Sequence, residues 1–448
     1  MRLHRYIFFL AMSSLFWSVL ICWKVKAEDR TSLLSLDLNA AINQALQENP
    51  DLKAKRQALG LARGRVQQAD LLFQENPQLS VDIDYRHRRF AAPTGRSVAD
   101  AEVRLTQEIE IAGQRHHRRE AAAKHLTQAE WLVADAERLL RWEVARGFYD
   151  LLAARARLAV QRQFVHAQDA LLRAGVQRFA REDISVIELD MLRLDRDRAQ
   201  SELATREIEE TLAEQQLRLL LGLDADTAFT AVGDLWASAP GQEAAGTFPP
   251  RESLEACALA HRPDLQAARL ALGVREAELR LARANRIPNI SLGPLYKSDN
   301  EDQVVGAGIL IPLPLFDRNQ HEITAALANL ETARTEFAAR GQVIRQEVAS
   351  AYTRLRLTAD RVALYGRSYL DDVTRSVTFT QKAYEAGELS IFEFSVAQDR
   401  FAQARLRYID AVAAYLHAVA ELEVRSTAAC LGPPTPPAGQ PQGGTKRQ

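Results

Sequence analysis

The sequence predicts a mainly α-helical protein with a small membrane β part, in which one structural unit is duplicated. Three observations predict this fold class. Segments 45–69 and 258–282 are identical at eleven of 25 positions, which indicates two long repeats and not a short-period solenoid. Each repeat contains stretches in which apolar and polar residues alternate, a period typical of strands. Proline is absent from 94–239 and 315–432, which favours long helices.

The composition excludes several classes of protein. The 57 Lys and Arg residues balance the 58 Asp and Glu residues, so no basic excess indicates a nucleic-acid partner. The hydrophobic share of 47% is too high for a largely disordered chain. The chain contains no Gly-x-Ser-x-Gly, no Walker loop and no Cys-x-x-Cys motif. We therefore predict that it is not an enzyme and uses no cofactor.

Residues 1–27 are predicted to be a secretory signal peptide. A positive region at residues 2–5 precedes an apolar stretch at residues 7–23 and a V-x-A pattern that ends at Ala27, as in cleaved signals. A retained membrane anchor is the alternative, and whether Cys22 is lipidated stays open. No transmembrane helix is expected after residue 27.

The two remaining cysteines are Cys257 and Cys430. The sequence alone does not decide whether they pair, and we expect two unpaired buried thiols. Two cysteines are too few for a disulfide scaffold.

Each repeat is predicted to contain a helix, a β-hairpin and a long helical hairpin. Asn49 followed by Pro50 is a favourable helix start, and this helix should run to about residue 73. The predicted segments are a first repeat at 28–225 (β-hairpin 78–111, helical hairpin 113–225), a linker at 226–250, a second repeat at 251–426 (β-hairpin 289–315, helical hairpin 317–426) and a disordered Pro/Gly-rich tail at 427–448.

The helical hairpins should be very long. A helix from Gln114 to about Arg181 would measure about 100 Å at 1.5 Å per residue. Ser185 and Ser390 each open an S-x-x-E capping box, so the helices should turn just before them, near 182–185 and 387–390. We expect these turns to be the only breaks in the two proline-free stretches, which puts both turns at the end furthest from the strands.

Four amphipathic strands are too few for a membrane barrel, because the smallest barrels have about eight strands and an open sheet leaves unsatisfied edges in lipid. A homotrimer would supply 4 × 3 = 12 strands in one shared barrel, with the long helices forming a tunnel below it. One strand face would meet lipid. The opposite face would line the lumen with Asp82, Asp84, Glu102 and Arg104.

This plan resembles the TolC-like outer-membrane efflux channels over residues 36–426. The doubled helix–hairpin–helix order and the repeated N/R-P-D-L segments at Asn49 and Arg262 carry the resemblance. Within that family the chain is most similar to the heavy-metal (cobalt–zinc–cadmium) branch. The motifs behind this are Ile-Pro-Leu-Pro-Leu-Phe-Asp-Arg-Asn at 311–319 and Glu-Ile-Ala-Gly-Gln-Arg at 110–115.

The resemblance implies an outer-membrane channel whose helical tunnel lies in the periplasm. It also implies a trimer with a 12-stranded barrel, a periplasmic adaptor (membrane fusion protein) and an inner-membrane pump of the resistance-nodulation-division type. The expected function is the exit duct of this tripartite pump, passively conducting heavy-metal cations. A duct for drugs or for type I protein secretion is the alternative. A periplasmic coiled-coil adaptor or scaffold is less consistent with the strands.

The resemblance also implies site residues at the two helical turns. Glu188, Tyr384 and Glu393 are the candidate gate residues, with Tyr384 helping to hold the tips together. The alternative is that each Glu only caps its helix. The candidate adaptor-docking tips contain Phe179, Glu182, Asp183, Gly387 and Glu388.

His116 and His117 are the most conspicuous candidate metal ligands. Adjacent helical residues point about 100° apart and chelate poorly, so we predict no metal site and interpret them as part of a solvated basic turn at the junction of barrel and tunnel. A metal site there is the alternative.

Overall fold

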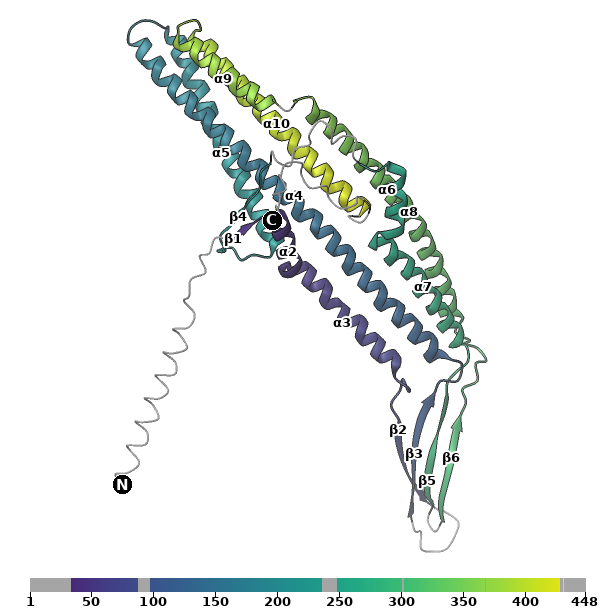
Figure 1. Cartoon of the computed structure of the whole chain (residues 1–448). Coiled ribbons are helices and arrows are strands. Elements are labelled where there is room, and N and C mark those ends of the chain that lie inside the picture. The colour runs from purple at the N-terminus through teal and green to yellow at the C-terminus, as the bar shows by residue number, and fades with distance from the viewer. Residues whose placement is uncertain are drawn as a thin grey trace, which may run out of the picture.

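The structure is a computed structural model that describes residues 34–87, 97–235, 248–299, 302–366, 368–427 and 430. It is mainly helical with a small β part, which confirms the predicted fold class. The molecule is elongated, with helical turns at one end and a four-stranded sheet at the other (Figure 1). The predicted signal peptide and nearly all of the predicted tail lie outside the described residues.

In the first repeat the helix α3 begins at the predicted place, where Asn49 Oδ1 accepts the backbone N–H of Leu52 at 3.0 Å. The helix α4 has 66 residues, about 100 Å at 1.5 Å per residue. The elements are α2 (Leu38–Glu48), α3 (Pro50–Asp70), β2 (Gln78–His87), β3 (Ser97–Ile109), α4 (Gln114–Phe179) and α5 (Val186–Leu221).

In the second repeat one helical arm is broken, so the expectation that the tips are the only breaks is wrong. Gly366 has a φ of +68°, a left-handed conformation that ends helices and favours glycine. The rings of Tyr365, Tyr369 and Tyr408 pack at this break, with centroids 4.8–5.5 Å apart. The elements are α6 (Arg251–His261), α7 (Pro263–Ala284), β5 (Ile290–Asp299), β6 (Asp302–Leu310), α8 (Gln320–Ala363), α9 (Tyr369–Glu385) and α10 (Ile391–Ser426).

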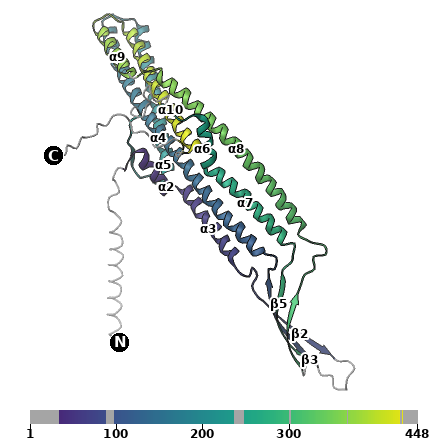
Figure 2. The same ribbon diagram turned by 45° about the vertical axis from the view of Figure 1, so that its right-hand side comes forward.

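The long helices lie side by side around α4. Toward the sheet α4 packs between α3 and α7, and toward the tips it packs between α5 and α10 (Figures 1 and 2). The helix α8 packs on α7 and α10. The layer therefore has α3 and α5 at one edge, and α8 and α9 at the other. Within the described ranges, no helix combines the length and apolar character needed to cross a bilayer.

The four strands form one antiparallel sheet in the order β2-β3-β5-β6. The register aligns Val81, Val103, Tyr296 and Val305 in one apolar row across all four strands. Gly293 is required where β5 crosses β3, because a Cβ there would lie 1.8 Å from the backbone oxygen of Leu105.

A small lateral subdomain was not foreseen from the sequence. The strand β1 (Leu34–Leu36) pairs in parallel with β4 (Phe229–Ala231), and α2 packs beside them on α4 and α5. Because β4 lies within the predicted linker 226–250, that segment is partly structured. Three-residue strands carry too little alternation to be recognised.

Cys257 and Cys430 form a disulfide, with Cα atoms 5.9 Å apart, so the expectation of two unpaired thiols is wrong. The helix α10 packs against α6, and Cys430 lies just past the end of α10. The packing of two helices remote in sequence therefore brings the thiols together. The bond fixes the start of the predicted tail to α6.

The two N/R-P-D-L segments fasten each repeat in the same way. Asn49 Nδ2 donates to the Leu220 carbonyl oxygen at 3.0 Å, and Arg262 Nη1 donates to the Arg425 carbonyl oxygen at 3.2 Å. Leu220 lies in the last turn of α5, and Arg425 in the last turn of α10. The first residue of each segment thus ties the start of its helix to the end of the returning long helix.

Arg262 is 1% exposed and has two further partners. Its Nε and Nη2 donate to Asp264 at 3.0 and 2.7 Å, and its Nη1 donates to Glu347 at 2.7 Å. Burial alone would raise the pKa of Asp264, but the hydrogen bonds and charge of Arg262 outweigh it, and the pKa lies below its usual value. Asp264 is therefore ionised and depends on Arg262.

We predict that Arg262→Met lowers the free energy of unfolding by roughly 3–5 kcal/mol, because it leaves the buried carboxylate of Asp264 with only the distant Arg340 Nε, at 3.9 Å, as an ion-pair partner. The control is Arg334→Met, which breaks an exposed pair with Glu331 worth about 0–1 kcal/mol. Denaturant unfolding at neutral pH measures both.

The loss of unfolding free energy caused by Arg262→Met should be smaller at low pH. Because the folded-state pKa of Asp264 is depressed, its stabilisation is present above the ordinary Asp pKa and is lost as pH falls through the folded value. Equal losses of unfolding free energy in Arg262→Met and Arg334→Met at neutral pH would contradict the role given to Arg262.

Candidate functional site

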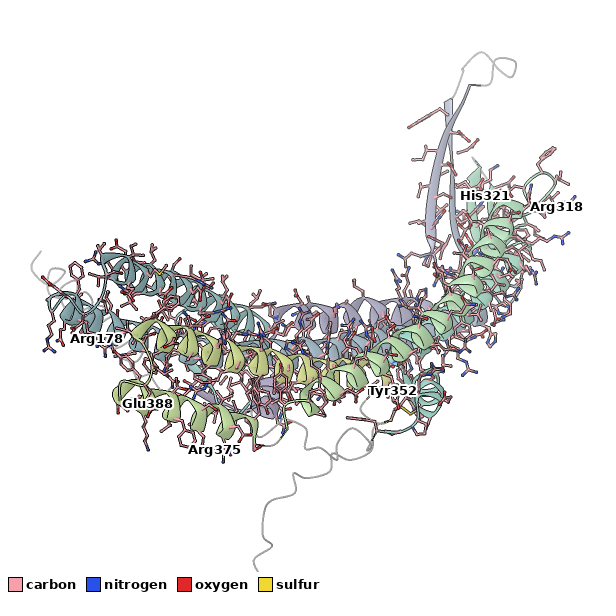
Figure 3. The ribbon with its side chains drawn as sticks, turned by 90° about the horizontal axis from the view of Figure 1, so that it is seen from above. Arg178, Arg318, His321, Tyr352, Arg375 and Glu388 are labelled. Atoms are coloured by element: carbon pink, nitrogen blue, oxygen red, sulfur yellow. A yellow bond between two sulfur atoms is a disulfide. The ribbon has the colours of Figure 1, made fainter. Side chains whose placement is uncertain are left out.

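The two helical turns lie together at the end of the molecule furthest from the sheet. Figure 3 shows Arg178 and Glu388 at this end, and Arg318 and His321 at the other, where α8 approaches the β-hairpins. The structure therefore brings the predicted docking residues to one end: Phe179, Glu182, Asp183, Gly387 and Glu388.

Both turns use the same backbone geometry. Glu182 and Gly387 occupy equivalent positions, with φ of 63° and 80°. In the first turn the N–H of Asp183 donates to a carbonyl oxygen five residues back at 2.9 Å, and in the second the N–H of Glu388 does the same at 2.9 Å. This is the usual left-handed helix ending that favours glycine. Glu182 is therefore a non-glycine residue in a strained conformation.

The two predicted capping boxes are both formed. The carboxylate of Glu188 accepts the N–H of Ser185 at 2.7 Å, and that of Glu393 accepts the N–H of Ser390 at 2.9 Å. These backbone hydrogen bonds, with smaller contributions from the serine hydroxyls, lower the pKa of both glutamates. Both stay ionised at neutral pH, and the cap is lost as pH falls through the depressed pKa.

An apolar cluster joins the two turns. It is formed by side chains from both repeats, and Tyr384 packs against it. The ring of Tyr384 stacks on Phe394 with centroids 4.6 Å apart, and the Arg178 guanidinium lies over the same ring at 5.2 Å. Tyr384 therefore links α9 to both α10 and α4. The buried members of the cluster are Leu171, Leu192, Ile391 and Phe394.

Sequence reasoning missed the polar contacts beside this cluster. Ser395 is 2% exposed, and its Oγ lies 3.1 Å from Asp195 Oδ2 and 3.4 Å from Gln168 Oε1. These contacts join α10 to α5 and α4. No periodic signal marks them, because they depend on how helices from different repeats align.

The four candidate lumen residues share one face of the sheet. Asp82 is opposite Glu102 in the register, and Glu102 is opposite Lys297. Arg104 forms an ion pair with Glu102 on the same strand. Asp84 follows on the same face, two residues after Asp82. The polar face therefore carries charges of both signs.

Comparison with protein families finds a match in two parts, one in each repeat. The model described as "Outer membrane efflux protein" matches residues 41–223 and 256–424, which together make up most of the chain. This chain belongs to the outer membrane efflux protein family. The unmatched interval falls between the repeats, and the outer-membrane location follows from the family.

Individual relatives agree with this assignment. The chain is 26% identical to the cobalt-zinc-cadmium resistance protein CzcC of Cupriavidus metallidurans over 378 residues, covering 84% of this chain and 86% of the relative. A crystal structure of a membrane protein from Pseudomonas aeruginosa is similar with a TM-score of 0.72 and 20% identity, covering 90% and 95% of the two chains. A crystal structure of CusC is similar with a TM-score of 0.68 and 20% identity, covering 89% of this chain and 93% of the CusC chain.

In this outer membrane efflux protein, His116, His117 and Glu120 have ligand atoms within 4.8 Å of one another. Glu120 already accepts from Lys124 Nζ at 2.8 Å and from Arg280 Nη2 at 2.6 Å. Two cations therefore occupy the one carboxylate of the group.

A second group, Cys257, His261 and Cys430, also has ligand atoms within 4.8 Å of one another. Its two sulfur atoms are joined in the disulfide, so neither is a thiolate ligand. This second group therefore does not offer three free ligands in the form that the structure describes.

We predict that Glu182→Gly raises the free energy of unfolding by about 1 kcal/mol, because a non-glycine residue in the left-handed region is strained by roughly that amount. The matched control is Gly387→Glu at the equivalent turn, which should lower the free energy of unfolding. Denaturant unfolding measures both. Shifts of the same sign in the two variants would show that the backbone argument is wrong.

Proposed function

We propose that this protein is the exit duct of a tripartite resistance-nodulation-division efflux pump, and that it passively conducts heavy-metal cations through a gated trimeric tunnel. The observation that carries the channel is the sheet, which has two edges available for pairing and lies at the end of a layer of helices (Figure 1), whose longest helix, α4, measures about 100 Å at 1.5 Å per residue. The family and the similarity to CzcC support the outer-membrane and metal parts.

The sheet supports a closed assembly of three copies. In the described part of the chain, β2 and β6 each pair on one side only. They run antiparallel to each other, so β6 of one copy can pair with β2 of the next and keep the sheet antiparallel throughout. Two copies would give about eight strands, whose interior is filled by side chains. Three copies give 4 × 3 = 12 strands, the smallest ring of this kind with room for a lumen.

The helices support the same ring. One edge of the layer, on α5, carries exposed apolar residues at spacings of three, four, seven and fourteen, which are compatible with a coiled-coil seam. The other edge carries apolar residues seven or fourteen apart on and just after α8. Two different apolar edges suit a head-to-tail contact that closes into a ring. The residues are Ile187, Met191, Leu194, Ile208, Leu212 and Leu219 on the first edge, and Val343, Leu357 and Leu364 on the second.

In this assembly the charged sheet face would line the lumen with Asp82, Asp84, Glu102 and Arg104, and the apolar face would meet lipid. The tips containing Phe179, Glu182, Asp183, Gly387 and Glu388 would receive the periplasmic adaptor, because they lie furthest from the membrane. Three copies each of Glu188 and Glu393 would concentrate negative charge at the tunnel entrance and attract cations. Tyr384 would hold the two hairpins of each copy together there.

We predict that a strain lacking this gene becomes more sensitive to cobalt, zinc or cadmium and keeps its sensitivity to drugs. The reason is that only the cargo of the intact pump accumulates when its duct is missing. Growth inhibition measures this, and the wild-type gene supplied in trans is the control. Increased sensitivity to drugs alone would favour the alternative of a drug duct.

We predict that Glu393→Gln lowers the cation selectivity of single channels and leaves thermal stability nearly unchanged. Gln also serves at this position of a capping box, so the variant removes the charge and keeps the cap. Ser390→Ala is the control, since it removes the serine cap at a cost of about 1 kcal/mol and keeps the charge. Unchanged selectivity in Glu393→Gln would leave Glu393 as a cap only.

A further inference from the structure

The segment 311–316, which joins β6 to α8, presents an unusual set of apolar side chains. Ile311, Leu313, Leu315 and Phe316 are 55%, 71%, 66% and 90% exposed. The segment belongs neither to the sheet nor to a helix. Four large apolar side chains exposed together in an irregular connection need a non-aqueous environment.

Part of the polar backbone of this segment is paired within the segment and with the start of α8. Pro312 and Pro314 have no N–H to satisfy. The N–H of Leu315 donates to the Leu313 carbonyl oxygen at 2.8 Å. The Pro314 carbonyl oxygen accepts from Arg318 Nε at 3.2 Å.

The last carbonyl of the segment is satisfied too, because Phe316 O accepts from Gln320 Nε2 at 3.1 Å. Unpaired backbone groups need water, so the backbone of the segment suits the hydrated headgroup region of a bilayer, from which its apolar side chains can reach the acyl chains.

The segment continues the apolar face of β6. Val305 and Ile309 are 81% and 71% exposed, and Ile311 and Leu313 follow them at intervals of two residues. Side chains two apart on an extended chain share a face. The face that would meet lipid in the proposed barrel is thus carried past the end of the strand.

The equivalent connection of the first repeat differs. Between β3 and α4, Glu110 pairs with Arg118. Of its side chains only Ile111 is a large exposed apolar group. The apolar connection therefore belongs to β6, the edge strand, and not to the fold in general.

We propose that residues 311–316 insert into the periplasmic leaflet of the outer membrane and anchor the junction of barrel and tunnel in lipid. Phe316 and the leucines would enter the acyl region. Arg318 is exposed, and its Nε contact with Pro314 leaves the Nη groups to bind lipid phosphates. The inference rests on the proposed function, because it assumes that the outer face of the barrel meets lipid.

The test uses the full-length protein in vesicles of phosphatidylethanolamine and phosphatidylglycerol. Phe316→Cys and, separately, Leu313→Cys are labelled with a thiol-reactive environment-sensitive fluorophore. Cys257 and Cys430 are joined in the disulfide and do not react, and Cys22→Ser removes the third thiol. Quenching is measured with a nitroxide-bearing phospholipid and with a water-soluble nitroxide. Val305→Cys is the control for the barrel face, and Phe179→Cys is the control for the aqueous tips.

The proposal expects the ratio of lipid to aqueous quenching at both segment positions to approach that at Val305→Cys and to exceed that at Phe179→Cys. The proposal is overturned if Val305→Cys is quenched from lipid while the two segment positions are quenched from water, or from neither phase because the next copy covers them. The proposed function as a duct is not affected by that result. If Val305→Cys is not quenched from lipid either, both the proposal and the proposed barrel fail.

Discussion

The open edges of the four-stranded sheet are the constraint on which the rest of the structure depends. Hydrocarbon offers no water to an unpaired N–H or C=O group, so β2 and β6 need partners if this sheet lies in a membrane. The register makes one face apolar across all four strands, from Val81 to Val305. A ring of copies gives β2 and β6 their partners and turns the apolar face of the sheet toward lipid. The apolar edges of the helical layer continue the contact between copies away from the membrane.

The duplication explains how so long a molecule keeps the alignment of its helices. Asn49 in the first repeat and Arg262 in the second fasten the end of a returning helix to the start of a short one. In the second repeat, Arg262 also forms a buried network with Asp264 and Glu347, and a disulfide lies close by. The two repeats therefore share one plan, and the second is fixed more firmly at its middle.

Local signals in the sequence predicted much of this fold. Alternation placed the strands, and the S-x-x-E boxes placed both helical turns. The break at Gly366 was missed because a single glycine in a helical pattern is a weak signal. The disulfide depends on the packing of α6 and α10, which are remote in sequence, and the contact between Arg178 and Tyr384 depends on helices from different repeats. Periodicity does not align either pair of helices. The sequence also could not separate cap from gate, because a glutamate at position 393 suits both roles.

The central claim is that three copies share one barrel. Native mass measurement of the purified full-length protein in detergent, with strand content followed by circular dichroism, tests it most directly. The account predicts a single species with three times the mass of the mature chain, and loss of strand signal when that species dissociates. A stable monomer that keeps its full strand content would contradict the account, because the sheet would then not need a partner at its edges.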